Sequence, residues 1–135
     1  MLFRSLPKLA RVRISTNLPV QHAALESLRG PQGYVSEFVS ELKKRRDFVV
    51  NRLNSISGLS CSVPKGAFYA FPKIENNSYK TDQEFVMELL RKTGVLTVHG
   101  SGFGAKYGSG HFRIVFLPDI KTLDFALNEI EKFCQ

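Results

Sequence analysis

Residues 95–116 read VLTVHGSGFGAKYGSGHFRIVF, two short β-prone runs separated by a glycine-dense loop. Successive side chains of a strand point to opposite faces, so Phe112, Ile114 and Phe116 are expected on one face of the second run. Arg113 is then expected on the other face. A guanidinium within so apolar a strand needs a planar acceptor to offset its desolvation. That acceptor is either an acidic residue of the chain or the carboxylate of a ligand, and composition leaves both open.

Upstream of this stretch, helical periodicity gives way to strand periodicity. Asn17 and the proline two residues later predict a helix over about 19–29 that ends at Gly30. A longer helix is expected between Gly33 and Gly58, because its apolar residues recur at steps of three, four and seven. Residues 59–63 and 67–71 have strand character and flank a turn at 64–66, which predicts an antiparallel pair.

The second half of the chain adds two helices and two strands. Residues 73–80 are polar and predict a loop. Thr81 and Glu84 form a capping box, so a helix is expected to begin there and to end at Gly94. Strands at 95–98 and 111–116 follow, and a last amphipathic helix begins after Asp119. This order predicts an α+β fold in which helices pack on one side of a small mixed β-sheet.

The charge of the chain is concentrated near its N-terminus. The chain has 135 residues and a formal charge of +7, and its first 25 residues hold four of the 19 basic side chains and no acidic one. We interpret residues 1–16 as a basic connector at a truncated N-terminus and residues 17–135 as the domain. As an alternative, this connector and the basic run Lys43–Arg46 could form a surface that binds nucleic acid. Aromatic residues interleaved with the basic ones would favour such a surface, and the run has none.

Other classes of protein are disfavoured by the sequence. No apolar run approaches the ~20 residues that cross a bilayer, so no membrane partner is expected. Two cysteines and three histidines lack metal-ligand spacing, so no metal site is expected, and a reduced, cytoplasmic chain is the default. Residues 100–105 match the pattern G-x-G-x-x-A, but the glycines at 108 and 110 argue against a stable helix behind it. A dinucleotide site is therefore rejected, and these glycines are expected to permit a tight turn or a close backbone approach.

Several segments together resemble a known family. They are Gln21–Leu25, Arg45–Asp47, Pro64–Tyr69, Gly102–Gly104 and Phe112–Ile114. In this order the stretch 17–133 resembles the C-terminal, smaller domain of pyridoxal-phosphate-dependent class I/II aminotransferases of the aspartate aminotransferase superfamily. That family usually has proline where this chain has His99. With this departure the chain looks most like the alanine aminotransferase branch, and an aspartate preference is in doubt.

The resemblance implies roles for two residues of this chain. Arg113 would bind the α-carboxylate of the substrate, and Phe68 would lie against the substrate pocket when the small domain closes. The lysine that forms the Schiff base, the aspartate at the pyridine nitrogen and the phosphate-binding residues lie upstream in that family, on a large domain. We therefore expect no catalytic and no cofactor-binding residue in this chain.

The same resemblance implies a cofactor, substrates and partners for the complete enzyme. The complete enzyme would use pyridoxal 5'-phosphate, which this chain alone is not expected to bind. Its partners would be the large domain, an amino acid and a 2-oxo acid, within a homodimer. A free-standing amino-acid-binding or protein-interaction module is the alternative, and it predicts binding by the chain alone.

Overall fold

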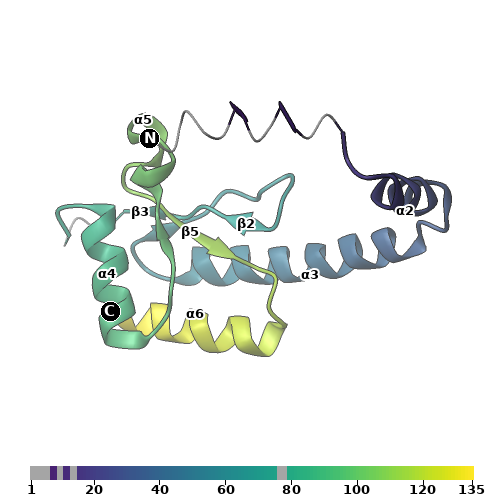
Figure 1. The fold of residues 1–135 in the computed structure, drawn as a ribbon. Coiled ribbons are helices and arrows are strands. Elements are labelled where there is room, and N and C mark those ends of the chain that lie inside the picture. Colours follow the sequence, from purple (N-terminus) through teal and green to yellow (C-terminus); the bar gives the residue numbers. More distant parts are fainter. Residues whose placement is uncertain (1–6, 9–10, 13–14, 76–78) are drawn as a thin grey trace. The chain divides into compact units, whose positions relative to one another are not determined.

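The computed structural model describes residues 7–8, 11–12, 15–75 and 79–135. The chain divides into two compact units, Met1–Glu37 and Phe38–Gln135, and Figure 1 shows the succession of elements through both. Most of the predicted connector, residues 1–16, lies outside the described residues. The boundary between connector and domain at residue 17 therefore stays a prediction.

The first unit contains the helix α2, Leu18–Arg29, which confirms the helix expected there. The side chain of Asn17 accepts a hydrogen bond from the backbone N–H of Val20 at 3.2 Å. This bond satisfies one of the N–H groups that have no partner within the first turn of a helix. The N–H of Gly30 donates to the carbonyl of Glu26 at the other end. None of the residues of α2 is buried within this chain.

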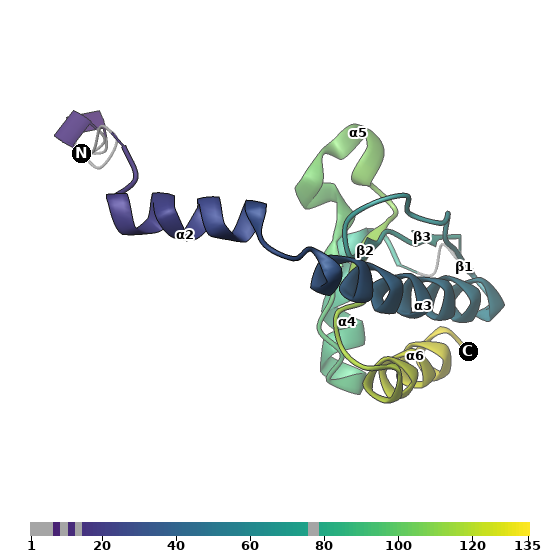
Figure 2. The ribbon, with the colours of Figure 1, turned by 90° about the vertical axis from the view of Figure 1, so that its right-hand side faces the viewer.

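Three helices contribute to the core of the second unit: α3, Gly33–Ser55, α4, Asp82–Thr93, and α6, Ile120–Cys134. α3 begins in the first unit and buries Val49, Val50 and Leu53 in the second. From Phe38 onward, α3 runs beside α6 beneath the strands (Figures 1 and 2). Arg52 of α3 joins the two helices, because its guanidinium lies 3.2 Å from Glu131 and 3.5 Å from Asp124 of α6.

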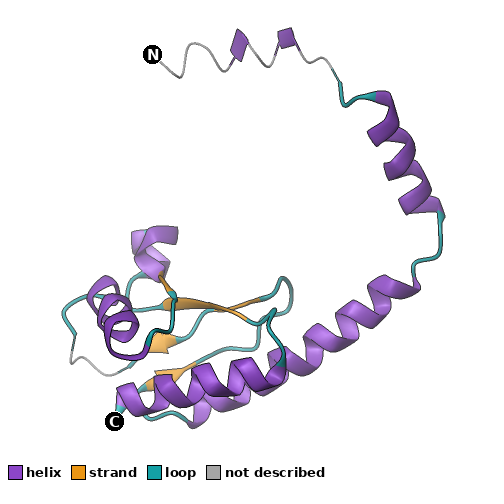
Figure 3. Ribbon diagram, turned by 60° about the horizontal axis from the view of Figure 1, so that its bottom comes forward, coloured by secondary structure: helices purple, strands orange, loops and turns teal. Residues whose placement is uncertain are grey.

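The strands form two small antiparallel sheets, shown in orange in Figure 3. In one, β1, Leu59–Ser60, pairs with β3, Lys73–Ile74. In the other, the central β5, Phe112–Val115, lies between β2, Tyr69–Ala70, and β4, Val98–His99. The α+β class is confirmed, with α3 and α6 on one side of the strands. The strands of the described residues pair only in the antiparallel sense, so the prediction of a mixed sheet was wrong in this detail.

Two predictions about the strands were wrong. Residues 59–63 and 67–71 do not pair with each other, because β1 pairs with β3 and β2 pairs with β5. Residues 73–80 are also not all loop, since Lys73 and Ile74 form β3. The apolar residues of β5 provide a better neighbour for β2 than the serine-rich segment after β1 does. Long-range packing therefore overrides the local turn signal at residues 64–66.

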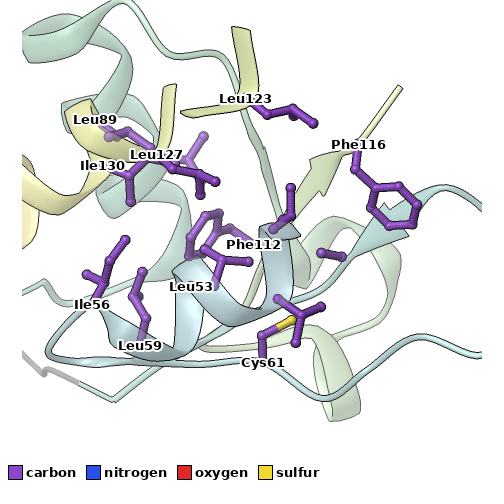
Figure 4. Close-up of a cluster of buried hydrophobic side chains, with 14 of the residues drawn as sticks. Leu53, Ile56, Leu59, Cys61, Leu89, Phe112, Phe116, Leu123, Leu127 and Ile130 are labelled. Carbon is purple, nitrogen blue, oxygen red and sulfur yellow. The ribbon is translucent and has the colours of Figure 1, made fainter. Parts of the chain in front are cut away.

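The core lies between β5 and the helices (Figure 4). Phe112 and Phe116 of this segment are 0% and 1% exposed, as the alternation predicted. The ring of Phe112 lies 5.1 Å, centroid to centroid, from that of Phe85 on α4. Further fully buried side chains come from the three helices: Val49, Leu53, Leu89, Leu127 and Ile130.

The cap that Thr81 forms at the start of α4 is confirmed, while Glu84 reaches back to the N–H of Lys80 and not to that of the cap residue itself. The hydroxyl oxygen of Thr81 accepts from the N–H of Glu84 at 3.1 Å, and the carboxylate of Glu84 accepts from the N–H of Lys80 at 2.9 Å. At the other end Gly94 adopts φ 75°, a left-handed conformation that glycine takes without strain. Local side-chain chemistry therefore sets both ends of α4.

Replacing Thr81 tests this capping. Thr81→Ala removes the acceptor and is expected to lower the free energy of unfolding by about 1 kcal/mol. Thr81→Ser keeps the hydroxyl and is the matched control, with an unfolding free energy near that of the original chain. Urea denaturation followed by circular dichroism measures both. Equal stability of the alanine and serine variants would show that the hydroxyl does not cap α4.

The glycine-dense loop forms a 3₁₀ turn, η1, Gly100–Phe103, and one turn of helix, α5, Ala105–Gly108. The expectation that no stable helix follows Gly100–Ala105 was wrong only for this single turn. The backbones of Gly100 and Gly108 touch, since a Cβ added to Gly108 would lie 1.9 Å from the carbonyl oxygen of Gly100. The predicted close approach is confirmed, and it brings the two ends of the loop together.

Candidate functional site

Arg113 lies on the face of β5 that is turned away from the core. Its cross-strand partner on β4 is Val98, and its neighbours along β5, Phe112 and Ile114, belong to the core face. The guanidinium lies between two aromatic rings, with its central carbon Cζ 4.4 Å from the ring centre of Tyr69 and 4.2 Å from that of Phe103. Both distances are within the range of cation–π attraction. The rings hold the plane of the guanidinium and leave its edge for polar partners.

The described residues do not supply the acceptor that the Arg113 guanidinium requires. Within the segments 7–8, 11–12, 15–75 and 79–135, Arg113 forms no ion pair, and its Nε is buried without a hydrogen-bond partner. A buried donor that lacks a partner costs free energy. The sequence left two acceptors open, an acidic residue of the chain and the carboxylate of a ligand. The geometry favours the carboxylate of a ligand.

Further aromatic side chains extend from the Phe103 ring that contacts Arg113. Tyr69, Phe71, Phe103 and His111 form what we call the aromatic patch. The ring of Phe71 stacks on that of His111 at 5.2 Å with an interplanar angle of 10°, and meets that of Phe103 edge-on at 6.2 Å. Reasoning from the sequence missed this patch. The alternation of Tyr69 and Phe71 around the buried Ala70 was an available signal, whereas nothing local indicated Phe103.

Phe68 occupies a different position from Arg113. It is half-buried and packs against the core, while its ring lies 4.5 Å from that of Tyr69. Among the described residues, Tyr69 links Phe68 to the guanidinium. The role predicted for Phe68 in the substrate pocket stays a prediction.

The turn that carries Phe103 is anchored at two points. Nδ1 of His99 accepts from the N–H of Gly102 at 3.2 Å and lies 3.0 Å from the hydroxyl of Ser101. The carboxylate of Asp82, at the start of α4, accepts from the N–H of Ser101 at 2.6 Å. Burial opposes the ionisation of Asp82, but hydrogen bonds from the backbone and hydroxyl of Ser101 outweigh it, so the pKa of this carboxyl group is lowered. Asp82 is therefore a charged acceptor.

The basic run on α3 is only partly a solvated surface. Lys43 and Lys44 are exposed, as predicted, but Arg45 and Arg46 are half-buried. Arg45 donates to the carbonyl of Leu117, and Arg46 donates to that of Pro64 at 3.5 Å. These two arginines hold loops of the domain in place. Fewer cations of this run are therefore free to bind the phosphates of a nucleic acid.

A cofactor that forms a Schiff base needs a lysine enclosed in its site. All ten lysines of this chain are exposed, and the expectation that none of them is the Schiff-base lysine stays a prediction. In the part of the chain that the structure describes, no group of histidine, cysteine or acidic residues is arranged to hold a metal ion. No helix there is long and apolar enough to cross a membrane.

An arginine between two rings, on the open face of a small α+β sheet and without an acidic partner among the described residues, is typical of a domain that binds an organic anion. Residues 2–130 match the profile of the family "Aminotransferase class I and II". The chain belongs to this family, whose members depend on pyridoxal phosphate.

Curated relatives of this family are similar to the chain over nearly its whole length. The glutamate-pyruvate aminotransferase of Haemophilus influenzae is 37% identical over 133 residues, which are 95% of this chain and 32% of the relative. A probable aspartate/prephenate aminotransferase of Rhizobium leguminosarum is 38% identical over 123 residues, which are 84% of this chain and 30% of the relative. The chain thus spans about a third of the length of these relatives.

Solved structures of the same kind are similar in fold. The alanine aminotransferase of Pyrococcus furiosus superposes with a TM-score of 0.87 at 52% identity, over 94% of this chain and 32% of that one. An aminotransferase of Escherichia coli has a TM-score of 0.82 at 35% identity, over 97% of this chain and 33% of that one. Both again match the chain over about a third of their own length.

Proposed function

We propose that this chain is the substrate-binding small domain of an aminotransferase, and that Arg113 binds the α-carboxylate of the amino acid and of the 2-oxo acid. The observation that carries this proposal is the guanidinium between Tyr69 and Phe103, whose Nε has no partner among the described residues. The family membership supplies the reaction class. The alanine and glutamate-pyruvate aminotransferases among the relatives support small amino acids and their oxo acids as substrates.

The arrangement suits carboxylate binding for three physical reasons. The guanidinium presents parallel N–H donors that match the two oxygens of a carboxylate. The flanking rings restrict its rotation, so less conformational entropy is lost when the ligand binds. The two rings cover the faces of the guanidinium and keep water from them, which strengthens the charge-assisted hydrogen bonds at its edge.

The remaining machinery belongs to the part of the enzyme that this chain does not span. When bound there, pyridoxal phosphate supplies the electron sink for amino transfer. This chain contributes the carboxylate anchor, and Phe68 supports it by backing the Tyr69 ring. Closure of the domain over the substrate would exclude water from the anchor. A homodimer and a cytoplasmic location complete the proposal for the whole enzyme.

A chimera tests the role of Arg113. This chain replaces the matching third of the P. furiosus alanine aminotransferase, and the product is assayed with glutamate and pyruvate. Arg113→Lys keeps the charge but loses the planar fork, so kcat/KM is expected to fall at least about a hundredfold. The loss should be similar for both substrates, because both carry the α-carboxylate.

The control for the chimera is Arg91→Lys. Arg91 is an arginine of α4 whose side chain is 66% exposed and pairs with Glu88. This substitution is expected to change kcat/KM by less than about twofold. If Arg113→Lys behaved like Arg91→Lys, Arg113 would not be the carboxylate anchor.

Calorimetry on the isolated chain separates the proposed fragment from the free-standing module. Alanine, glutamate and pyruvate are titrated into the original chain and into Arg113→Ala. The proposed fragment gives no heat at millimolar ligand, because the rest of the pocket is missing. Saturable binding that Arg113→Ala abolishes would favour an amino-acid-binding module instead.

A further inference from the structure

His99 holds the turn next to Arg113 through its ring nitrogen. It is the last residue of β4, and its Nδ1 accepts the N–H of Gly102 at 3.2 Å. A nitrogen that accepts this bond carries no proton, and the hydroxyl oxygen of Ser101 lies 3.0 Å from the same nitrogen. The neutral form of His99 with its proton on Nε2 is therefore the form that fits this turn.

The ring of His99 is also packed against the turn. A Cβ added to Gly102 would lie 3.0 Å from Cε1 and 3.4 Å from Nδ1 of His99. The first of these distances is tighter than an ordinary van der Waals contact. The ring thus occupies the space that a side chain at position 102 would need.

Asp82 is the second anchor of this turn. Asp82 is 6% exposed, and its carboxylate accepts the N–H of Ser101 at 2.6 Å. His99 is in turn the last of several causes that lower the pKa of Asp82, after the hydrogen bonds from Ser101. Of the other elements packed here, α5 directs Lys106 to the ring of Tyr107 at 5.1 Å, and β5 directs Arg113 to Tyr69 and Phe103.

The position of Phe103 depends on the backbone of the turn. Its side chain is 52% exposed, yet its ring centre lies only 4.2 Å from Cζ of Arg113. A half-exposed ring is not fixed by burial, and its aromatic contact with Phe71 is an edge-on one at 6.2 Å. Whatever holds residues 100–103 therefore places the Phe103 ring on the guanidinium.

We propose that His99 is a positioning residue for Arg113: its neutral ring and Asp82 together hold the Gly100–Phe103 turn, which keeps Phe103 over the guanidinium. Protonation of His99 puts a donor where Gly102 needs an acceptor, so the turn loosens at low pH and Phe103 leaves the guanidinium. The effect of this turn on substrate binding rests on the proposed function. The dependence of the Phe103 position on His99 is a property of the folded chain.

Nuclear magnetic resonance on the 135-residue chain tests this inference without any substrate. The chain is titrated from about pH 8 to about pH 5, across the range in which histidines change charge. Two signals are followed: the exchange rate of the Gly102 amide proton and the ring-current shift of the Cδ protons of Arg113. We expect exchange, corrected for its intrinsic pH dependence, to become about tenfold faster as His99 is protonated, with loss of most of the ring-current shift.

Two substitutions of His99 sharpen the test. His99→Asn retains an oxygen that can accept from Gly102 but does not titrate, so both signals should stay at their high-pH values throughout. His99→Ala removes the acceptor and should show the low-pH behaviour at every pH. The amide of Leu53, in the buried part of α3, reports that the fold is intact.

Two results would overturn the proposal. One is an unchanged Gly102 exchange rate and Arg113 shift across the titration of the original chain, a measurement that requires no variant to fold. The other is a titration that persists in His99→Asn, which would assign it to His22 or His111. Neither result would affect the role of Arg113 as carboxylate anchor, which the kinetics of Arg113→Lys test separately.

Discussion

Phe112→Ala is expected to lower the free energy of unfolding by about 4 kcal/mol. Phe112 is 0% exposed, lies in the central strand β5 and contacts the ring of Phe85 on α4. Its truncation leaves a cavity between the sheet and the helices, which neighbours on both sides are too constrained to fill. Since small domains are stable by about 5–15 kcal/mol, this loss removes a large part of the stability of the chain.

Urea denaturation of the 135-residue chain measures this loss. The control is Phe125→Ala on α6, because Phe125 is the same residue type but 66% exposed. Its expected effect is below about 0.5 kcal/mol. A similar loss for both variants would mean that the core does not centre on β5.

Gly108→Ala is expected to lower the free energy of unfolding by about 3 kcal/mol and to displace the glycine-dense loop. The new Cβ would lie 1.9 Å from the oxygen and 2.5 Å from the carbon of the Gly100 carbonyl. Both atoms belong to the backbone, so no side-chain rotation relieves the clash. The two segments must separate, which strains the bond from the N–H of Gly100 to the carbonyl of His111, now 2.8 Å long.

Gly66→Ala is the matched control for this substitution. A Cβ on Gly66 meets no atom within 4 Å, and Gly66 is not among the glycines with positive φ. Its effect on stability should stay within about 0.5 kcal/mol. Urea denaturation gives the stabilities, and the Arg113 ring-current shift shows whether Phe103 has moved. Equal stability of Gly108→Ala and Gly66→Ala would contradict the close approach of the Gly100 and Gly108 backbones.

The helix ends were predictable because capping depends on residues close in sequence. Asn17, Thr81 and Asp119 each accept from an N–H three residues later, and Gly94 ends α4 in the left-handed conformation. The strand pairing was not predictable in the same way. The turn at residues 64–66 favoured a local hairpin, but β2 pairs with β5, far along the chain.

The candidate site was also predictable only where it depends on a local sequence pattern. The period of two in residues 111–116 placed Arg113 opposite to the core face, and the resemblance to aminotransferases gave the arginine a role. The residues that flank it were missed, because Tyr69 and Phe103 reach it from β2 and from the turn after β4. His99 was noted only as a departure from a proline, and its contacts with Ser101 and Gly102 emerged from the folded loop.

The amino-acid sequence by itself determined the family, the α+β class, the ends of the helices and the face of β5 on which Arg113 lies. Each of these follows from side chains a few residues apart or from a regular period. Only the tertiary structure decided which strands pair, that Gly100 and Gly108 touch, and that Tyr69 and Phe103 enclose the guanidinium. These contacts join distant segments, and the choice among distant partners is made by the burial of a shared core, which no local pattern encodes.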